Sequence, residues 1–415
     1  MKKLLSLALA ILMLAVMLPV TAMAATAAPS WEGGVNFENV TTGVKYTNNL
    51  GEVMTSDETT TKTALVAYQK DGTIVYAADV WAAIKEGATE IYCKADATVP
   101  IRDRAVDTQR TPDLTNNLTI YGNGATFGYG QISVNMTDSG KSANITVTVY
   151  DAKNIEIWGY TPNNGVTQNF NMINCTNTGT SATGSSGIMV YITDAGTGVV
   201  NPGTVNLVVK DCHIEKNSSG IYNSANGTMT VTGTTFVDCA AGIKVSYKGE
   251  QTRTDTIENC TFTNCGCTEE MAGNTNWLKD DSAAIIYKNG RTGTADVTIT
   301  NNTITDTLTK NTLGDIRVKN ANATITPNGT TTTVNTGIKD TLETITGKVT
   351  VDAKGTITPV KEEGPTTIVI ISPTQDTPKT DDQKNPTTGA NDLVAVAVAA
   401  AALALAGSAI ILRKD

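Results

Sequence analysis

A six-residue pattern that recurs four times in the middle of the chain constrains its fold more than any other feature. The first and sixth residues of each copy are apolar, and the copies occupy residues 209–214, 231–236, 257–262 and 299–304. The third residue is of a type that tolerates a left-handed backbone: Asp211, Gly233, Asn259 and Asn301. We therefore predict that each copy consists of two short strands that flank a sharp bend.

A third apolar segment follows each copy and completes a repeat of regular length. These segments contain Ile221, Ile243, Ile285 and Ile316. The first two repeats measure 22 and 26 residues, and segments 118–127, 145–157 and 187–190 fit the same rhythm. Such repeats are typical of solenoids, in which each coil buries its apolar side against its neighbours. The sequence thus predicts three short strands per coil.

The composition supports an all-β fold, because Thr favours strands while the abundant Asn and Gly favour tight bends. Three short strands in a repeat of 22 residues resemble the right-handed parallel β-helix of pectate-lyase-like proteins. The resemblance implies coils that stack ~4.8 Å apart, with equivalent residues in ladders along the solenoid axis.

The cysteines follow the repeat, which favours buried thiols over disulfides. Cys239 and Cys265 occupy one repeat position in adjacent coils, and Cys212 and Cys260 share another. A free cysteine behaves as a small apolar residue and is often buried. We expect no metal site and no cofactor, because the chain has a single histidine, His213, and no paired-cysteine motif.

The N-terminus has the three regions of a secretory signal peptide. Lys2 and Lys3 precede an apolar run over residues 4–20, and Ala22 and Ala24 form a small-residue cleavage site. We expect cleavage before Ala25. The alternative is a first transmembrane helix, for which the apolar run is short.

The C-terminus resembles the cell-wall sorting signal of Gram-positive surface proteins. A short motif, Asn385, Pro386, Thr387, Thr388 and Gly389, precedes an apolar segment over residues 393–412 and a basic end. The apolar segment is long enough to span a membrane, and the basic end fits the cytoplasmic side. The resemblance implies that a sortase cleaves between Thr388 and Gly389 and joins the chain to peptidoglycan in the extracellular cell wall. The alternative is a permanent membrane anchor.

These features divide the chain into five parts. Residues 1–24 are the signal peptide, and residues 25–90 form an N-terminal segment and cap, with a helix expected over 78–84. Residues 91–345 form the parallel β-helix. Residues 346–384 hold terminal strands and a disordered Pro/Thr-rich stalk, and residues 385–415 hold the sorting signal with its transmembrane helix.

In pectate-lyase-like proteins the binding groove follows the outer face of one sheet, which by resemblance contains the third segments. If the isoleucines of these segments point inward, the residues beside them point outward. This alternation predicts a basic strip of ligand-binding candidates: Tyr222, Lys244, Lys288, Arg317 and Lys319. Such a strip favours an acidic polysaccharide or a host glycan as partner, although a solvated strand face is the alternative. A formal net charge of −9 argues against nucleic acid.

Two short matches resemble the polygalacturonase family. Asp280 and Asp281 resemble its paired aspartates, and Arg317 and Lys319 resemble its Arg-Ile-Lys motif, but two further motifs of that family are missing. The leading hypothesis is therefore a non-catalytic adhesin or glycan-binding protein displayed on the wall. The alternatives are a wall-anchored polysaccharide lyase or glycoside hydrolase, and a passive stalk.

Overall fold

The structure is a computed structural model that describes residues 27–44, 60–101, 110–179, 189–193, 202–246, 250, 253–266, 283–288, 293–305, 314–328, 332–336 and 343–361. These residues belong to the first of two compact units, Met1–Lys361; the second unit, Glu362–Asp415, lies outside them. The predicted signal peptide, stalk and sorting signal with residues 393–412 therefore lie outside the described residues. Within the described ranges, none of the helices is long and apolar enough to cross a membrane.

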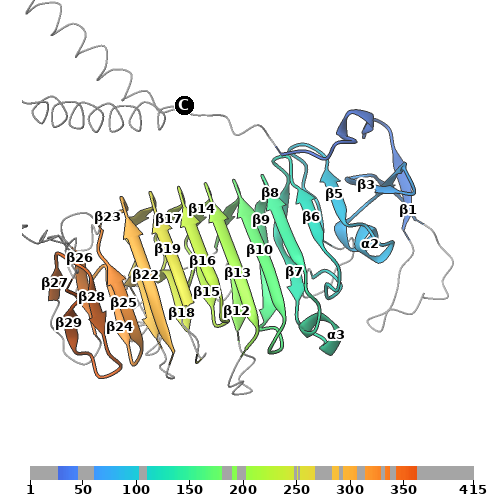
Figure 1. Ribbon diagram of the computed structural model, residues 1–415. Helices are drawn as coiled ribbons and strands as arrows, with labels where there is room; N and C mark the ends of the chain where they lie inside the picture. Colours follow the sequence, from blue (N-terminus) through green and yellow to red (C-terminus); the bar gives the residue numbers. More distant parts are fainter. Residues whose placement is uncertain are drawn as a thin grey trace, which may run out of the picture. The chain divides into compact units, whose positions relative to one another are not determined.

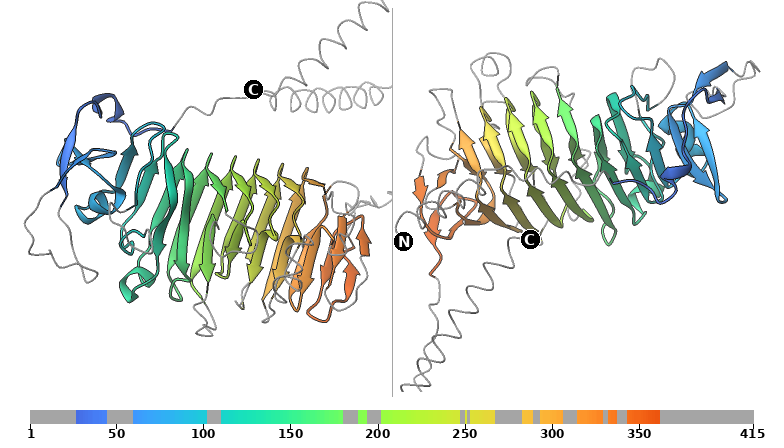
Figure 2. Two further views of the ribbon diagram at one scale, coloured as in Figure 1. Left: turned by 180° about the vertical axis from the view of Figure 1, so that it is seen from behind. Right: turned by 90° about the horizontal axis from the view of Figure 1, so that it is seen from above.

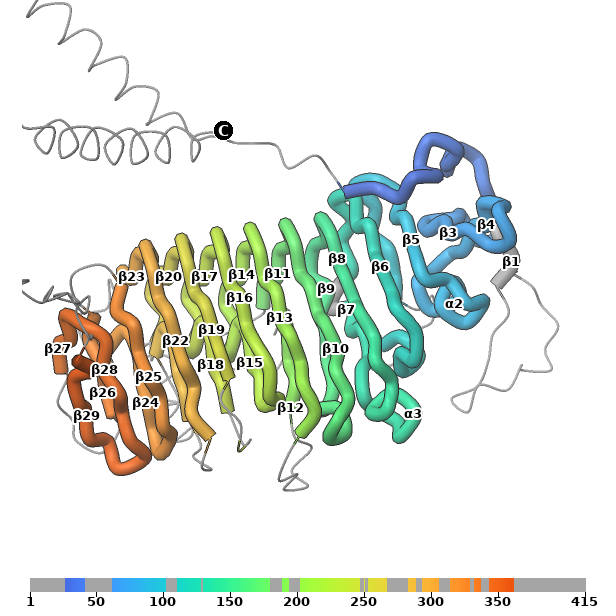
Figure 3. The backbone as a smooth tube through the Cα atoms, in the orientation of Figure 1, coloured from blue at the N-terminus to red at the C-terminus, as the bar shows by residue number. Residues whose placement is uncertain are grey.

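The first unit is all-β and is built from two long, mostly parallel sheets of 13 and 14 strands (Figure 1). Each coil supplies three strands, as in β13 (Thr204–Lys210), β14 (His213–Glu215) and β15 (Ile221–Asn223). Equivalent strands of successive coils pair in parallel and form three ladders, and successive coils follow the same path (Figure 3). The predicted three-strand coil and its solenoid-like stacking are confirmed.

The first ladder runs through one sheet. Its parallel strands are β5 (Glu90–Cys93), β6 (Leu118–Tyr121), β8 (Thr146–Tyr150), β10 (Thr167–Ile173), β13, β16 (Thr228–Thr232), β19 (Arg253–Glu258), β22 (Thr294–Thr300) and β25 (Asn322–Thr326).

The second and third ladders share the other sheet (Figure 2). The second contains β11 (Thr176–Thr178), β14, β17 (Thr235–Val237), β20 (Thr261–Thr263) and β23 (Thr303–Thr305). The third contains β12 (Val190–Thr193), β15, β18 (Ala241–Ser246), β21 (Ala283–Lys288), β24 (Ile316–Lys319) and β26 (Thr332–Asn335). The two ladders meet in the long strand β9 (Lys153–Tyr160), which pairs with both β11 and β12 and also with β7 (Thr126–Val134).

Left-handed residues separate the first ladder from the second, as predicted. The φ angles of Asp211, Gly233, Asn259 and Asn301 are 53°, 59°, 55° and 54°. A second row of left-handed residues follows the second ladder, at Lys216, Asp238 and Asn264. The sequence pattern did not reveal this second bend, because one of its members is a lysine.

The register places one apolar residue of each coil above its equivalents in the next. Ile221, Ile243, Ile285 and Ile316 pair in this order and are fully buried. The predicted inward direction of these isoleucines is therefore confirmed. Phe236 and Phe262 stack inside the solenoid with their ring centroids 4.7 Å apart.

Antiparallel strands and a short helix flank the parallel ladders. At the N-terminal end, β3 (Val66–Lys70) and β4 (Thr73–Ala77) form a hairpin on β5, beside α2 (Val80–Lys85). Asp79 caps α2 by accepting a 2.7 Å hydrogen bond from the Ala82 amide. This helix confirms the helix predicted there. At the other end, the antiparallel strands are β27 (Glu343–Ile345), β28 (Val349–Val351) and β29 (Ile357–Pro359).

The remaining elements lie near the N-terminus. They are η1 (Glu32–Gly34), the pair β1 (Thr41–Val44) and β2 (Thr60–Thr63), and the short helix α3 (Asp138–Lys141).

Candidate functional site

The predicted basic strip lies on the outer side of the third ladder. Tyr222, Lys244, Ile286 and Arg317 form one column, because each pairs with the next across neighbouring strands. Lys288 and Lys319 are neighbours in a parallel column. The register predicted from the sequence is thus confirmed for these residues.

The prediction that this strip is exposed to solvent is wrong for two of its residues. Lys244 and Arg317 are each only 6% exposed, and Ile286 is buried with Ala241 and Ala283 in a small apolar cluster of its own. Lys244 extends along its column, with Nζ 5.4 Å from the centroid of the Tyr222 ring. A lysine buries its aliphatic stem readily when a ring or an apolar neighbour lies beside it. Lys244 and Arg317 are therefore packed against their neighbours. Lys288 and Lys319 are half-buried.

An aromatic row continues the column towards the N-terminus. Trp158 in β9, Tyr191 in β12 and Tyr222 in β15 are neighbours in register. The centroids of Trp158 and Tyr191 lie 5.8 Å apart with an interplanar angle of 18°, and those of Tyr191 and Tyr222 lie 5.0 Å apart at 32°. At these separations nearly parallel rings overlap only in part. All three rings are half-buried.

Cations lie against this aromatic row. Cζ of Arg110 is 4.1 Å from the centroid of the Trp158 ring, and Lys244 lies over Tyr222 at the other end. Beside Trp158, the ring of Tyr160 is 6.0 Å away, and Nζ of Lys141 is 5.8 Å from the Tyr160 centroid. Arginine and lysine are attracted to ring faces within about 6 Å. The row therefore carries positive charge at both of its ends.

A chain of hydrogen bonds holds Arg110 in place. Its Nε donates to Oε1 of Gln131 at 2.7 Å, and Nε2 of Gln131 donates to Oε2 of Glu156 at 3.1 Å. Glu156 is 2% exposed, so this carboxylate lies behind the row rather than in solvent. Among the described residues, no carboxylate forms an ion pair with Arg110 or Lys141. Within the described ranges, neither of these two cations is therefore neutralised by a carboxylate.

Sequence reasoning identified Tyr222 but missed Trp158, Tyr191, Arg110 and Lys141. A usable signal was present for two of them, since an aromatic residue follows the inward-facing apolar residue at 157–158, 190–191 and 221–222. The strand expected at 187–190 is instead Val190–Thr193, which hid this alignment. No periodic signal marks Arg110 or Lys141, because they lie outside the repeat positions.

A buried polar cluster also lies inside the solenoid. Arg253 donates to Asp255 through Nε at 2.8 Å and through Nη2 at 2.9 Å, and its Nη1 donates to the Ala225 carbonyl at 2.7 Å. The Tyr287 hydroxyl donates to Asp255 at 2.7 Å. All three side chains are at most 1% exposed. The cluster is therefore structural, because a ligand has no access to it.

The described cysteines do not form a reactive centre. The six described cysteines are buried free thiols, which confirms the prediction for Cys239, Cys265, Cys212 and Cys260. Burial raises the pKa of Cys260 to about 11 and also raises that of Cys265. The thiolate is the reactive form, so these residues are inert at neutral pH.

The residues of the catalytic alternative are only partly placed. Arg317 and Lys319 lie in β24, whereas Asp280 and Asp281 lie outside the described residues. In the ranges that the structure describes, no group of three His, Cys, Asp or Glu residues could hold a metal ion.

Comparison with known proteins adds no relative: no family model, no curated protein and no solved structure matches the chain.

Proposed function

We propose that this protein is a wall-anchored surface protein of a Gram-positive bacterium, and that its solenoid is a right-handed parallel β-helix of the pectate-lyase-like type. The three-strand coils and the order of the ladders support the fold. The signal peptide over residues 1–24 and the sorting signal over residues 385–415 support export, sortase processing and attachment to peptidoglycan. Residues 393–412 hold the precursor in the membrane until the sortase acts.

Within this proposal the protein is a non-catalytic binding protein whose ligand is an acidic polysaccharide. The carrying observation is that Arg110 and Lys141 lie over the rings of Trp158 and Tyr160 without a described carboxylate partner. The rings accept the apolar C–H face of a sugar, while the cations attract its carboxylate or sulfate groups. A host glycan with the same acidic groups would satisfy the same chemistry.

The site differs from the strip predicted by the sequence alone. The sequence placed the binding surface at Lys244 and Arg317, which are almost fully buried. The surface proposed here is instead the aromatic row from Trp158 to Tyr222. Lys288 in β21 and Lys319 in β24 remain candidates for additional contacts beyond the Tyr222 end of the row.

A polysaccharide lyase or glycoside hydrolase is the second candidate. It is favoured by Arg317 and Lys319, which follow Asp280 and Asp281 along the chain in the motif order of polygalacturonases. Inverting hydrolysis requires two carboxyl groups ~6.5–9.5 Å apart across the sugar. Glu156, the carboxylate found next to the aromatic row, is buried and already accepts a hydrogen bond from Gln131.

One experiment with polygalacturonate and its neutral methyl ester distinguishes the binding protein from the enzyme. We expect the purified chain to bind the polyanion, to bind the ester at least about tenfold more weakly, and to release no new chain ends. Trp158→Ala should weaken binding, whereas Thr230→Ala, on the outer face of the first ladder, should not. Release of shortened or unsaturated products would establish the enzyme instead. Equal binding of the ester would exclude the role assigned to Arg110 and Lys141.

A further inference from the structure

Aromatic residues also gather on the outer face of the first ladder. Tyr92, Tyr121 and Tyr150 pair in register on β5, β6 and β8, one ring per coil, and we call them the tyrosine column. The rings of Tyr121 and Tyr150 are nearly parallel, with centroids 5.7 Å apart and an interplanar angle of 11°. All three residues are half-buried, so part of each ring faces solvent.

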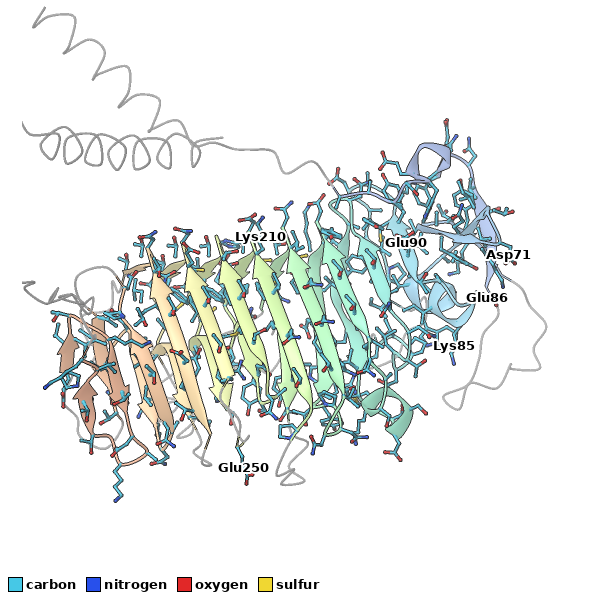
Figure 4. All side chains as sticks on the ribbon, viewed as in Figure 1. Asp71, Lys85, Glu86, Glu90, Lys210 and Glu250 are labelled. Atoms are coloured by element: carbon cyan, nitrogen blue, oxygen red, sulfur yellow. The ribbon has the colours of Figure 1, made fainter. Side chains whose placement is uncertain are left out.

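The N-terminal segment extends this aromatic surface and fixes it. Trp31 packs edge-on against Tyr92 at 6.5 Å, and Phe37 stacks on Tyr92 at the same distance. Nε1 of Trp31 and the hydroxyl of Tyr121 both donate to the carboxylate of Glu90, at 3.1 Å each. Glu90 is labelled in Figure 4 beside the cap. Because these contacts hold the rings in fixed positions, the surface is formed before any ligand arrives.

Acidic side chains lie near two of the hydroxyls in the tyrosine column. Burial raises the pKa of Tyr121 to about 12, and the charge of Glu90 adds to the rise. Burial also raises the pKa of Tyr92, with a further contribution from Glu32. The two carboxylates that contribute to these rises are thus Glu90 at Tyr121 and Glu32 at Tyr92.

The two aromatic surfaces differ in the cations that accompany them. On the third ladder, Arg110 and Lys244 lie over the rings at the ends of the row. Over Tyr121 and Tyr150, no lysine or arginine lies among the residues that the structure describes. In register, Ile173 follows Tyr150 and Lys210 follows Ile173, whereas in the aromatic row Lys244 follows Tyr222 directly. The lysine on this side of the tyrosine column thus lies one strand farther from the rings than Lys244 lies from Tyr222.

We propose that the tyrosine column is a second binding site, whose ligand is a protonated amino-sugar chain. Ring faces and a nearby carboxylate both attract an ammonium group. One ring per coil, at the strand spacing of ~4.8 Å, suits a ligand with repeated flat sugar rings. A lysine-rich peptide supplies the positive charge but no repeated sugar face. This site is separate from the aromatic row and does not depend on the function proposed there.

The test compares two oligosaccharides with the same backbone: a short chitosan oligomer, whose amines are protonated at mildly acidic pH, and its fully N-acetylated counterpart. Titration of the purified full chain, followed by calorimetry and by tryptophan fluorescence, should give at least about tenfold tighter binding of the protonated oligomer. Tyr150→Leu should weaken that binding about threefold or more, because one ring contact is lost.

A substitution at Ile173 provides the sharper comparison. Ile173→Lys should place a cation beside Tyr150, as Lys244 lies beside Tyr222, and should weaken binding of the protonated oligomer about tenfold. Ile173→Gln is the matched neutral control. Thr300→Lys adds the same charge in the same column at its far end and controls for the general attraction of a polycation to an acidic protein.

The proposal is overturned if the N-acetylated oligomer binds as tightly as the protonated one, or if Ile173→Lys and Thr300→Lys have the same effect. It is also overturned if polylysine competes as well as the oligomer at equal charge, because the surface would then recognise charge alone. Unchanged circular dichroism and melting temperature show that each variant is folded, so that a loss of binding reports on the site.

Discussion

Removal of the Asp255 carboxylate should destabilise the solenoid strongly, because the charge of Arg253 would remain inside it. Asp255 is fully buried and accepts three hydrogen bonds, two from Arg253 and one from the Tyr287 hydroxyl. In Asp255→Ala, the Arg253 guanidinium keeps its bond to the Ala225 carbonyl but loses both charge-assisted hydrogen bonds to Asp255. Breaking a buried pair in this way costs about 3–5 kcal/mol of unfolding free energy.

Two further variants separate the charge effect from the loss of packing. Tyr287→Phe removes one hydrogen bond to a charged group and should cost about 1.5–3 kcal/mol, since Arg253 stays paired. The double replacement Arg253→Met with Asp255→Leu removes both charges and should be far less harmful than Asp255→Ala, because apolar replacements of buried ion pairs are often neutral.

Urea unfolding followed by circular dichroism measures these differences, provided that the dependence on urea concentration stays the same in all variants. A loss below about 1 kcal/mol in Asp255→Ala would refute the reasoning, since breaking a buried, doubly hydrogen-bonded ion pair costs several kcal/mol. The same holds if the double variant is as unstable as Asp255→Ala, because packing rather than charge would then dominate.

Three other predictions follow from the sequence and the fold. Thr388 should be the C-terminal residue of the mature protein, amide-linked to the wall, and mass spectrometry of wall digests would show it; recovery of intact residues 393–412 on mature protein would exclude it. Cys239 and Cys265 should react slowly with alkylating agents at neutral pH and quickly after unfolding, because burial raises the pKa of Cys265 and keeps its thiol protonated; rapid labelling of folded protein would contradict this. Asn259→Val should cost about 1–2 kcal/mol, because Asn259 has a φ of 55°, which a β-branched residue adopts with strain; Asn259→Gly should be tolerated, and equal melting temperatures of the two variants would exclude the bend as the cause.

The regular part of the fold was predictable because one chemical requirement recurs in every coil. Asp211, Gly233 and Asn259 mark a left-handed bend, and their spacing fixes where the flanking strands begin and end. The isoleucines of the third ladder then set which side chains point inward. The second bend escaped prediction because Lys216, which tolerates a left-handed backbone poorly, occupies one of its positions.

The candidate site was predictable only in part. The column of Tyr222 and Lys244 followed from side-chain alternation, but alternation does not report how deeply an outward-facing side chain packs against its neighbours. The burial of Lys244 depends on the Tyr222 ring beside it, and that of Ile286 on Ala241 and Ala283. Arg110 reaches the aromatic row from outside the repeat, so only the three-dimensional path of the chain brings it to Trp158.

The order of strands in the 13-stranded sheet determines how far the aromatic coils lie from the point where the chain leaves the sheet. The cap strand β4 stands at one end and β29 at the other, so the sheet extends over 12 strand spacings, or roughly 58 Å. Both aromatic surfaces occupy coils before residue 223, and the chain leaves the sheet at the opposite end. Because each coil touches only its neighbours, whole coils between β19 and β25 can be gained or lost without altering the aromatic rings of either surface. Evolution can thus adjust how far the aromatic coils stand from the chain's exit in increments of a single coil, independently of what they bind.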